Sequence, residues 1–141
     1  MPVEAPKKTS EKPAVFRAVG RRKTAVARAR VFNGEGMIVV NDKPITEYFS
    51  GPVARLRYEK PFEVTNTRGK LSASVKVVGS GKTGQLDALV QGISRALALM
   101  SEDYHGKLRN AGLLTRDSRA KERRKYGLAG KARKRKQSPK R

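Results

Sequence analysis

Residues 79–84 read Gly-Ser-Gly-Lys-Thr-Gly, and these residue types are typical of a loop that cradles a nucleotide phosphate. The segment follows a predicted strand and precedes a predicted helix, which is the context that such a loop needs. The full pattern also requires a glycine five residues before Gly81, and that position is Lys76. Two interpretations remain open. Either Lys82 and the amides of a helix N-terminus bind a single phosphate, or the glycines serve a tight turn.

Other side chains offer little for catalysis or metal binding. His105 is the only histidine, and no serine or acidic residue stands at a spacing that would make it a catalyst. The carboxylates are scattered singly, so no general acid–base pair is indicated. The chain has no cysteine, which excludes disulfides and zinc-finger spacing. We therefore predict a protein that is not an enzyme and that uses no metal and no cofactor.

Positive charge dominates the sequence. The 141 residues include 33 Lys or Arg against 12 Asp or Glu, for a formal net charge of +21. From residue 116 onward the chain has thirteen basic and two acidic residues, so the charge is densest in this last segment. Such a chain attracts a polyanion, because each phosphate that it neutralises releases counterions. An anionic membrane is the competing partner, but the sequence shows neither a membrane-binding amphipathic helix nor a membrane span.

Three groups of cations are candidates for contact with nucleic-acid phosphates, and they lie in residues 20–24, along one face of the strand at residues 25–32, and in the basic run from residue 116. Residues 20–24 place three adjacent cations at a strand junction, with a solvated basic loop as the alternative. Arg28 and Arg30 continue the charge along one face of a strand. Few aromatic residues accompany the cations, so we expect phosphate and shape contacts rather than base stacking. The candidate contacts are Arg21, Arg22, Lys23, Arg28, Arg30, Lys82, Arg116, Arg119, Arg123, Arg124, Lys125, Lys131, Arg133, Lys134, Arg135 and Lys136.

The elements that position these residues follow from the periodicity of the sequence. Alternating apolar residues predict strands at residues 14–19, 25–32 and 71–78. Asn33-Gly34 predicts a hairpin turn into a fourth, returning strand at residues 37–40. Apolar residues at three- and four-residue steps predict a long helix at residues 85–100. Shorter helices are expected at residues 45–49, 52–59, 102–111 and, within the basic region, 117–126.

These elements predict an α/β domain of the two-layer α+β kind, in which helices pack on one face of a small four-stranded sheet. Residues 41–44 are expected to interrupt that sheet. We divide the chain into a disordered N-terminal tail, a globular domain and a basic C-terminal extension, at residues 1–13, 14–115 and 116–141. The end of the extension, from residue 127, has too little apolar surface to fold without a partner.

Three passages stand in the order and spacing of one known family. They are residues 20–28, residues 79–97, and residues 113–119 with the chain that follows to Lys140-Arg141. Through them the chain resembles the bacterial form of small-subunit ribosomal protein nine, over about residues 19–141. Within the second passage the matching positions are Gly79, Gly81, Gly84, Gln85, Ala88, Gly92, Ile93, Arg95, Ala96 and Leu97.

The resemblance implies a ribosomal α/β fold with a left-handed β-α-β crossover. It implies a place in the head of the small ribosomal subunit, in the bacterial cytoplasm, beside neighbouring proteins and without homo-oligomers or membrane contact. The candidate cations would then bind small-subunit rRNA. Lys140 and Arg141 match the terminal pair of the family, which implies contact with the anticodon stem-loop of peptidyl-site tRNA.

The chain departs from the family pattern at two places. Ser80 stands where members commonly have the middle of three glycines, which restricts the backbone or adds a hydroxyl donor. Ser138-Pro139 stands where a Phe-Ser step is common, so an aromatic side chain is absent before the terminal pair. Two other functions remain open at this point. They are a free-standing basic nucleic-acid binder, and a nucleotidase whose nucleotide binding Lys82→Ala would abolish.

Overall fold

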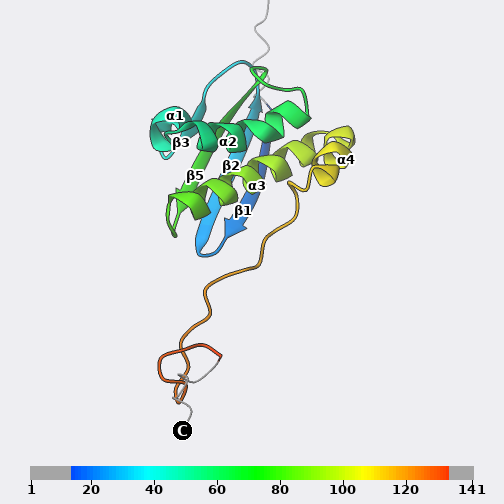
Figure 1. Ribbon diagram of the computed structural model, residues 1–141. Coiled ribbons are helices and arrows are strands. Elements are labelled where there is room, and N and C mark those ends of the chain that lie inside the picture. The colour runs from blue at the N-terminus through cyan, green and yellow to red at the C-terminus, as the bar shows by residue number, and fades with distance from the viewer. Residues whose placement is uncertain (1–13, 134–141) are drawn as a thin grey trace, which may run out of the picture.

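The computed structural model describes residues 14–133, in which helices pack on one face of a sheet (Figure 1). The sheet has five strands in the order β1-β2-β5-β3-β4. Their bounds are Val15–Arg22 for β1, Ala25–Asn33 for β2, Ile38–Val40 for β3, Lys43–Pro44 for β4 and Leu71–Val78 for β5. The helices are Ile45–Tyr48 for α1, Pro52–Val64 for α2, Lys82–Met100 for α3 and Glu102–Asn110 for α4. The expected mixed α/β architecture is confirmed.

A hairpin of β1 and β2 forms one edge of the sheet. Pairing continues to Arg22 opposite Ala25, so β1 runs three residues beyond its predicted end. Lys23 makes the turn with a positive φ of 52°. Small apolar residues face the helices and are buried, and they are Ala25, Ala27, Ala29 and Val31. The predicted period-two pattern of β2 is therefore confirmed.

The predicted hairpin between β2 and β3 is wrong. β2 pairs with β5 in antiparallel fashion, whereas β3 lies on the far side of β5 and pairs with it in parallel, with Ile38 opposite Ala73. β5 is eight residues long, with apolar residues at alternate positions, and can pair with β2 over its whole length. β3 is only three residues long. Residues 33–36 are thus the start of a connection across the sheet. The chain then returns through α1 and α2, which makes β3 and β5 a β-α-β unit.

Residues 41–44 do not interrupt the sheet, as the sequence had suggested, but add its fifth strand. Asn41 and Asp42 both adopt positive φ, at 46° and 66°, and turn the chain so that β4 pairs with β3. Asn41 also binds β5 through its side chain. Its Nδ2 donates to the backbone carbonyl of Val77, and its Oδ1 accepts from the backbone N–H of Val77, both at 2.9 Å. These residues tolerate the left-handed conformation well.

The predicted helices are present except one. α2 extends to Val64, five residues past its predicted end and with Pro61 inside it, and α3 begins at Lys82 instead of residue 85. The helix expected at residues 117–126 does not form, since this segment runs without helical structure up to a series of turns at 126–130. Its side chains lack an apolar face that could pack on the domain, and packing is what stabilises most short helices.

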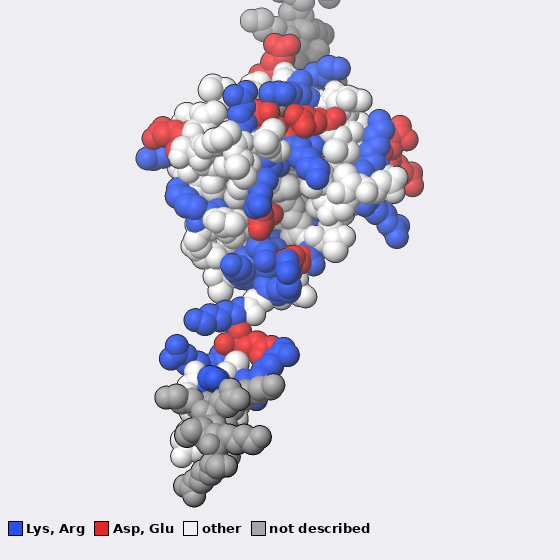
Figure 2. Space-filling model, in the orientation of Figure 1, with Lys and Arg blue, Asp and Glu red and all other residues white. Residues whose placement is uncertain are grey.

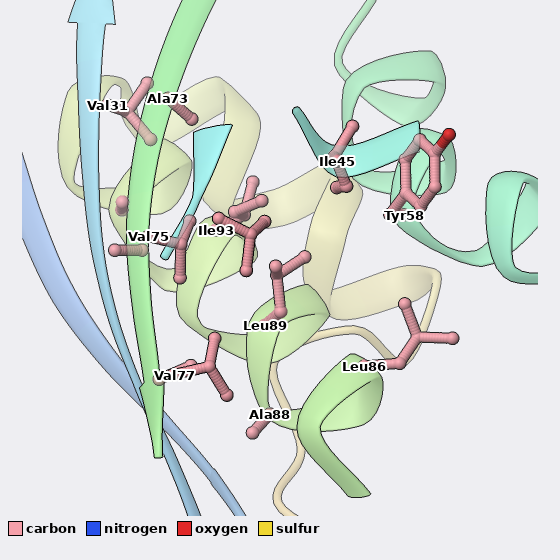
Figure 3. Packing of buried hydrophobic residues seen from close by; sticks show 14 of the residues in the cluster. Val31, Ile45, Tyr58, Ala73, Val75, Val77, Leu86, Ala88, Leu89 and Ile93 are labelled. Atoms are coloured by element: carbon pink, nitrogen blue, oxygen red, sulfur yellow. The ribbon is translucent and has the colours of Figure 1, made fainter. Parts of the chain in front are cut away.

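The core lies between α3 and the sheet. Leu89, Ile93 and Leu97 are completely buried, and the side chains of β2 and β5 point toward them (Figure 3). Two polar residues of α3 are buried as well. Gln91 is only 8% exposed and lies against β1, where it accepts from the amide of Arg21, and Ser94 is fully buried. Ser94 is satisfied by donating to the carbonyl of Val90 at 2.7 Å.

The approach of α3 to the edge strand β1 depends on two facing glycines. A Cβ at Gly20 would lie 1.9 Å from the carbonyl oxygen of Ala88, and one at Gly92 would lie 3.2 Å from the amide of Gly20. Because the two backbones are this close, side chains of α3 can form hydrogen bonds with backbone groups along the unpaired edge of β1. Gln91 accepts from the amide of Arg21 at 2.8 Å, and Arg95 donates to the carbonyl of Val19 at 2.7 Å.

Candidate nucleic-acid interface

The tip of the β1–β2 hairpin divides the adjacent cations between two faces. Side chains alternate along a strand, so Arg21 and Arg22 point to opposite sides of the sheet. Arg21 and Lys23 are exposed. Arg22 points to the helical side, where its side chain is only 14% exposed. The three cations that look equivalent in the sequence therefore have different surroundings.

Arg22 joins the C-terminal extension to the globular domain. Its guanidinium lies 3.7 Å from Asp87 on α3 and 3.1 Å from Asp117 in the extension, and it also donates to the backbone carbonyl of Arg119. We call this group of contacts the Arg22 anchor. It holds residues 117–119 against the hairpin tip, so Arg22 is already engaged within the protein.

Asp117 completes the anchor. Its carboxylate accepts from the guanidinium of Arg119 at 2.8 Å and from the Arg119 amide at 3.0 Å. These bonds, with a further contribution from Arg22, hold the pKa of Asp117 well below its ordinary value of 3.8. Most of this lowering of the pKa comes from Arg119, which lies in the extension itself, and Arg22 favours the ionised carboxylate further. The contact is therefore fully present above pH 3.8 and weakens as the pH falls below that value.

We predict that Arg22→Ala releases the extension, whereas Arg21→Ala does not. Removal of Arg22 deletes two ion pairs and a backbone contact, and Arg21 makes no ion pair among the described residues. The chain has no cysteine, so spin labels can be placed at Leu99→Cys and Ala120→Cys. The label-to-label distance distribution should be narrow in the parent and in Arg21→Ala, and at least about twofold broader in Arg22→Ala.

Two further results test this anchor. Asp117→Asn should broaden the same distance distribution, since it removes the charge that faces Arg22. Lowering the pH of the parent through the depressed pKa of Asp117, well below 3.8, should do so as well. Equal distributions in Arg21→Ala and Arg22→Ala would show that the extension is not held by these contacts.

The extension carries a second group of exposed cations. Arg116, Arg123, Arg124, Lys125 and Lys131 are exposed and make no ion pair with a described residue. Arg119 and Arg133 are paired locally, with Asp117 and Glu122. Figure 2 shows basic side chains gathered where the extension leaves the domain and again along its described end. The predicted contacts Lys134, Arg135, Lys136, Lys140 and Arg141 lie outside the described residues.

A hollow of about 280 Å³ lies between the hairpin tip, α2, α3 and the start of the extension. Arg22 of the hairpin lines it, together with two cations of α2 that are not among the predicted contacts, Arg57 and Lys60. Arg57 is half-exposed and lies 3.2 Å from Asp87. A continuous basic run marks residues 20–24 and 116–141, but single cations within a mixed helix such as α2 give no such signal.

Lys82 lies apart from these cations. Its ammonium donates to the carbonyl of Tyr48 at 3.1 Å and sits 3.7 Å from the centre of the Tyr48 ring. Gly79 has a φ of 85°, and a Cβ there would lie 2.5 Å from the carbonyl oxygen of Thr24. Ser80 also adopts positive φ, at 52°, and its hydroxyl lies over Gly84. These contacts favour the interpretation in which the loop glycines serve close packing.

Arg28 and Arg30 lie on the face of the sheet that has no helices, and both are exposed. Two cations that the sequence analysis left out, Arg17 on β1 and Lys76 on β5, lie on the same face. Residues 14–133 contain no group of three or more His, Cys, Asp or Glu arranged to hold a metal ion. No helix within that range combines the length and apolar character needed to span a membrane.

The fold and the interface define a small basic protein with a surface suited to a polyanion. A model of the family described as ribosomal protein S9/S16 matches residues 20–141. A protein of Solidesulfovibrio magneticus called small ribosomal subunit protein uS9 is 48% identical over 115 residues, which cover 82% of this chain and 88% of the relative. Its namesake in Dehalococcoides mccartyi is 48% identical over 118 residues, covering 84% and 89%. The chain therefore belongs to the ribosomal protein S9 family, whose members are structural, non-enzymatic proteins.

Proposed function

We propose that this chain is a structural constituent of the small-subunit head that binds small-subunit rRNA and, through its last residues, peptidyl-site tRNA. As a member of a bacterial ribosomal family it works in the cytoplasm, within the ribosome. Its partners are then rRNA, tRNA and neighbouring proteins of the head. It acts as a single copy with no homo-oligomer and no membrane contact.

One observation carries the rRNA part of this proposal. The Arg22 anchor holds residues 117–119 against the hairpin tip, where Lys23 and Lys121 line one hollow, so that the two basic segments meet at this point. These two segments are far apart in the sequence, since Arg22 and Arg119, which share a hydrogen bond, are 97 residues apart. A surface of this kind fits a phosphate backbone, because it supplies many cations and few groups that read bases.

The tRNA part depends on the end of the extension. From Asp117 to Arg141 the chain has 24 further residues, which can reach at most about 80 Å when extended. An Arg can bind a phosphate through two donors and a Lys through a point charge, so Lys140 and Arg141 suit a tRNA backbone. Because the Arg22 anchor holds residues 117–119 against the domain, this length of chain is measured from that point.

We predict that deletion of residues 138–141 leaves subunit assembly intact and speeds dissociation of peptidyl-site tRNA. Loss of two phosphate contacts should raise the off-rate by roughly threefold to tenfold. The measurement is the dissociation of labelled tRNA from small subunits that carry either the full chain or the shortened one.

The matched control removes the same two charges elsewhere. Lys107→Gln with Arg109→Gln alters two exposed cations of α4, and this double variant should leave the tRNA off-rate unchanged. An off-rate for the shortened chain equal to that of the full chain would contradict the tRNA role. That result would not bear on the proposed rRNA contact, because binding of tRNA and binding of rRNA are measured separately.

A further inference from the structure

The face of the sheet without helices carries opposed cations. Because β1, β2 and β5 are antiparallel neighbours in register, Arg17 lies directly opposite Arg30, and Arg28 lies directly opposite Lys76. All four side chains are exposed. We call these four residues the cation rows. Directly opposed residues on antiparallel strands have Cβ atoms about 5 Å apart, so the two cationic side chains of each pair project from adjacent positions.

Among residues 14–133, no acidic partner lies on this face. Its other positions are apolar or hydroxyl residues apart from Arg21, and none of the cation rows makes an ion pair with a described residue. The helical side is different, because Arg55 pairs with Glu59 at 2.8 Å and Arg68 pairs with Glu59 at 2.9 Å. Like charges directly opposite on a sheet are destabilising. The free protein therefore carries repulsion here that it avoids on its other side.

We propose that the cation rows dock on the phosphate backbone of small-subunit rRNA and that RNA relieves their repulsion. This inference depends on the proposed function and adds a second RNA-binding surface to the hairpin tip and extension. The chemistry favours phosphates over bases. Ser74 lies opposite Arg30 and offers a small hydroxyl donor, while the one aromatic residue on these strand positions, Phe32, is partly buried.

A protein partner is the competing occupant. Val15 and Val78, at opposite ends of the face, are 36% and 72% exposed and would suit an apolar contact. The centre of the face decides between the two, because the described strands place four cations and no carboxylate there. A protein surface would have to supply a dense acidic patch there, whereas an RNA backbone supplies one charge for every nucleotide.

If the proposal is right, removing cations from this face should raise the thermal stability of the free protein and lower its affinity for RNA. Arg30→Thr with Lys76→Thr removes one member of each opposed pair and introduces a residue that strands accept well. In 50 mM salt the Tm of this double variant should exceed that of the parent, and the gain should vanish in 1 M salt, where charges are screened. Its affinity for purified small-subunit rRNA should fall by about tenfold at 0.2 M salt, with a shallower dependence of affinity on salt.

Lys107→Gln with Arg109→Gln is the matched control, because it removes the same charge from the helical side. It should show no gain in Tm and less than about a twofold loss of affinity. An unchanged affinity of the cation-row variant, or an equal loss in the control, would overturn the proposal. So would a variant that binds rRNA normally but fails to join small subunits, since that result assigns the face to a protein. Failure of the parent itself to bind rRNA would instead refute the proposed function.

Discussion

Deletion of residues 116–141 is expected to remove most of the affinity of this chain for small-subunit rRNA. The segment contains thirteen of the 33 basic residues. If about seven of them bind phosphates, the loss at 0.2 M salt is on the order of a thousandfold, and the slope of log affinity against log salt falls by about 5. Filter binding of the full and shortened chains over a series of salt concentrations measures both quantities.

Two controls separate this effect from damage to the domain. The shortened chain keeps Leu113 and Leu114, which pack against the core, so its thermal unfolding should resemble that of the full chain. Deletion of residues 2–13 removes three lysines and two glutamates from the other end and should change rRNA affinity less than about threefold. A shortened chain that binds within tenfold of the parent would show that the extension is not the main RNA contact.

Gly20→Ala is expected to have the largest effect on stability of any single change considered. The new Cβ would lie 1.9 Å from the carbonyl oxygen of Ala88 and 2.4 Å from the amide nitrogen of Gly92, and both are backbone atoms of α3. The strand and helix would have to separate, with loss of the bonds from Gln91 and Arg95. We expect a loss of about 3 kcal/mol or more in the free energy of unfolding, measured by urea denaturation.

Gly106→Ala should increase the free energy of unfolding, in contrast to Gly20→Ala. Gly106 lies within α4, and a Cβ there meets nothing within 4 Å. Alanine favours the helix over glycine, so this variant should gain about 0.5–1 kcal/mol. If Gly20→Ala stayed within about 1 kcal/mol of the parent, the close approach of β1 and α3 would not be a requirement of the fold.

Local sequence patterns predicted the elements of this fold better than their pairing. β5 was predicted to the residue and α3 within three residues, because each has a long apolar period that only one element satisfies. The hairpin after Asn33 was wrong for a non-local reason. β2 can pair with β3 or with β5, and the choice depends on a strand that begins at residue 71. A turn signal at one position contains no information about that competition.

The candidate interface was predicted as a set of cations, but the surroundings of each cation were not. Arg22 was grouped with Arg21 and Lys23, although the alternation of a strand places it on the other face. Its partners Asp87 and Asp117 are 65 and 95 residues away in the sequence, so folding alone brings them together. Arg17 and Lys76 were missed for a similar reason, because each is a single cation until the register sets it opposite another.

Cross-linking of rRNA to this chain within purified small subunits tests the central claim most directly. After irradiation and nuclease digestion, mass spectrometry identifies the lysines that carry nucleotide adducts. The proposed interface predicts adducts on Lys23, Lys125 and Lys131, which are exposed at the hairpin tip and along the extension. Adducts found on Lys107 of α4 and absent from those three lysines would contradict it.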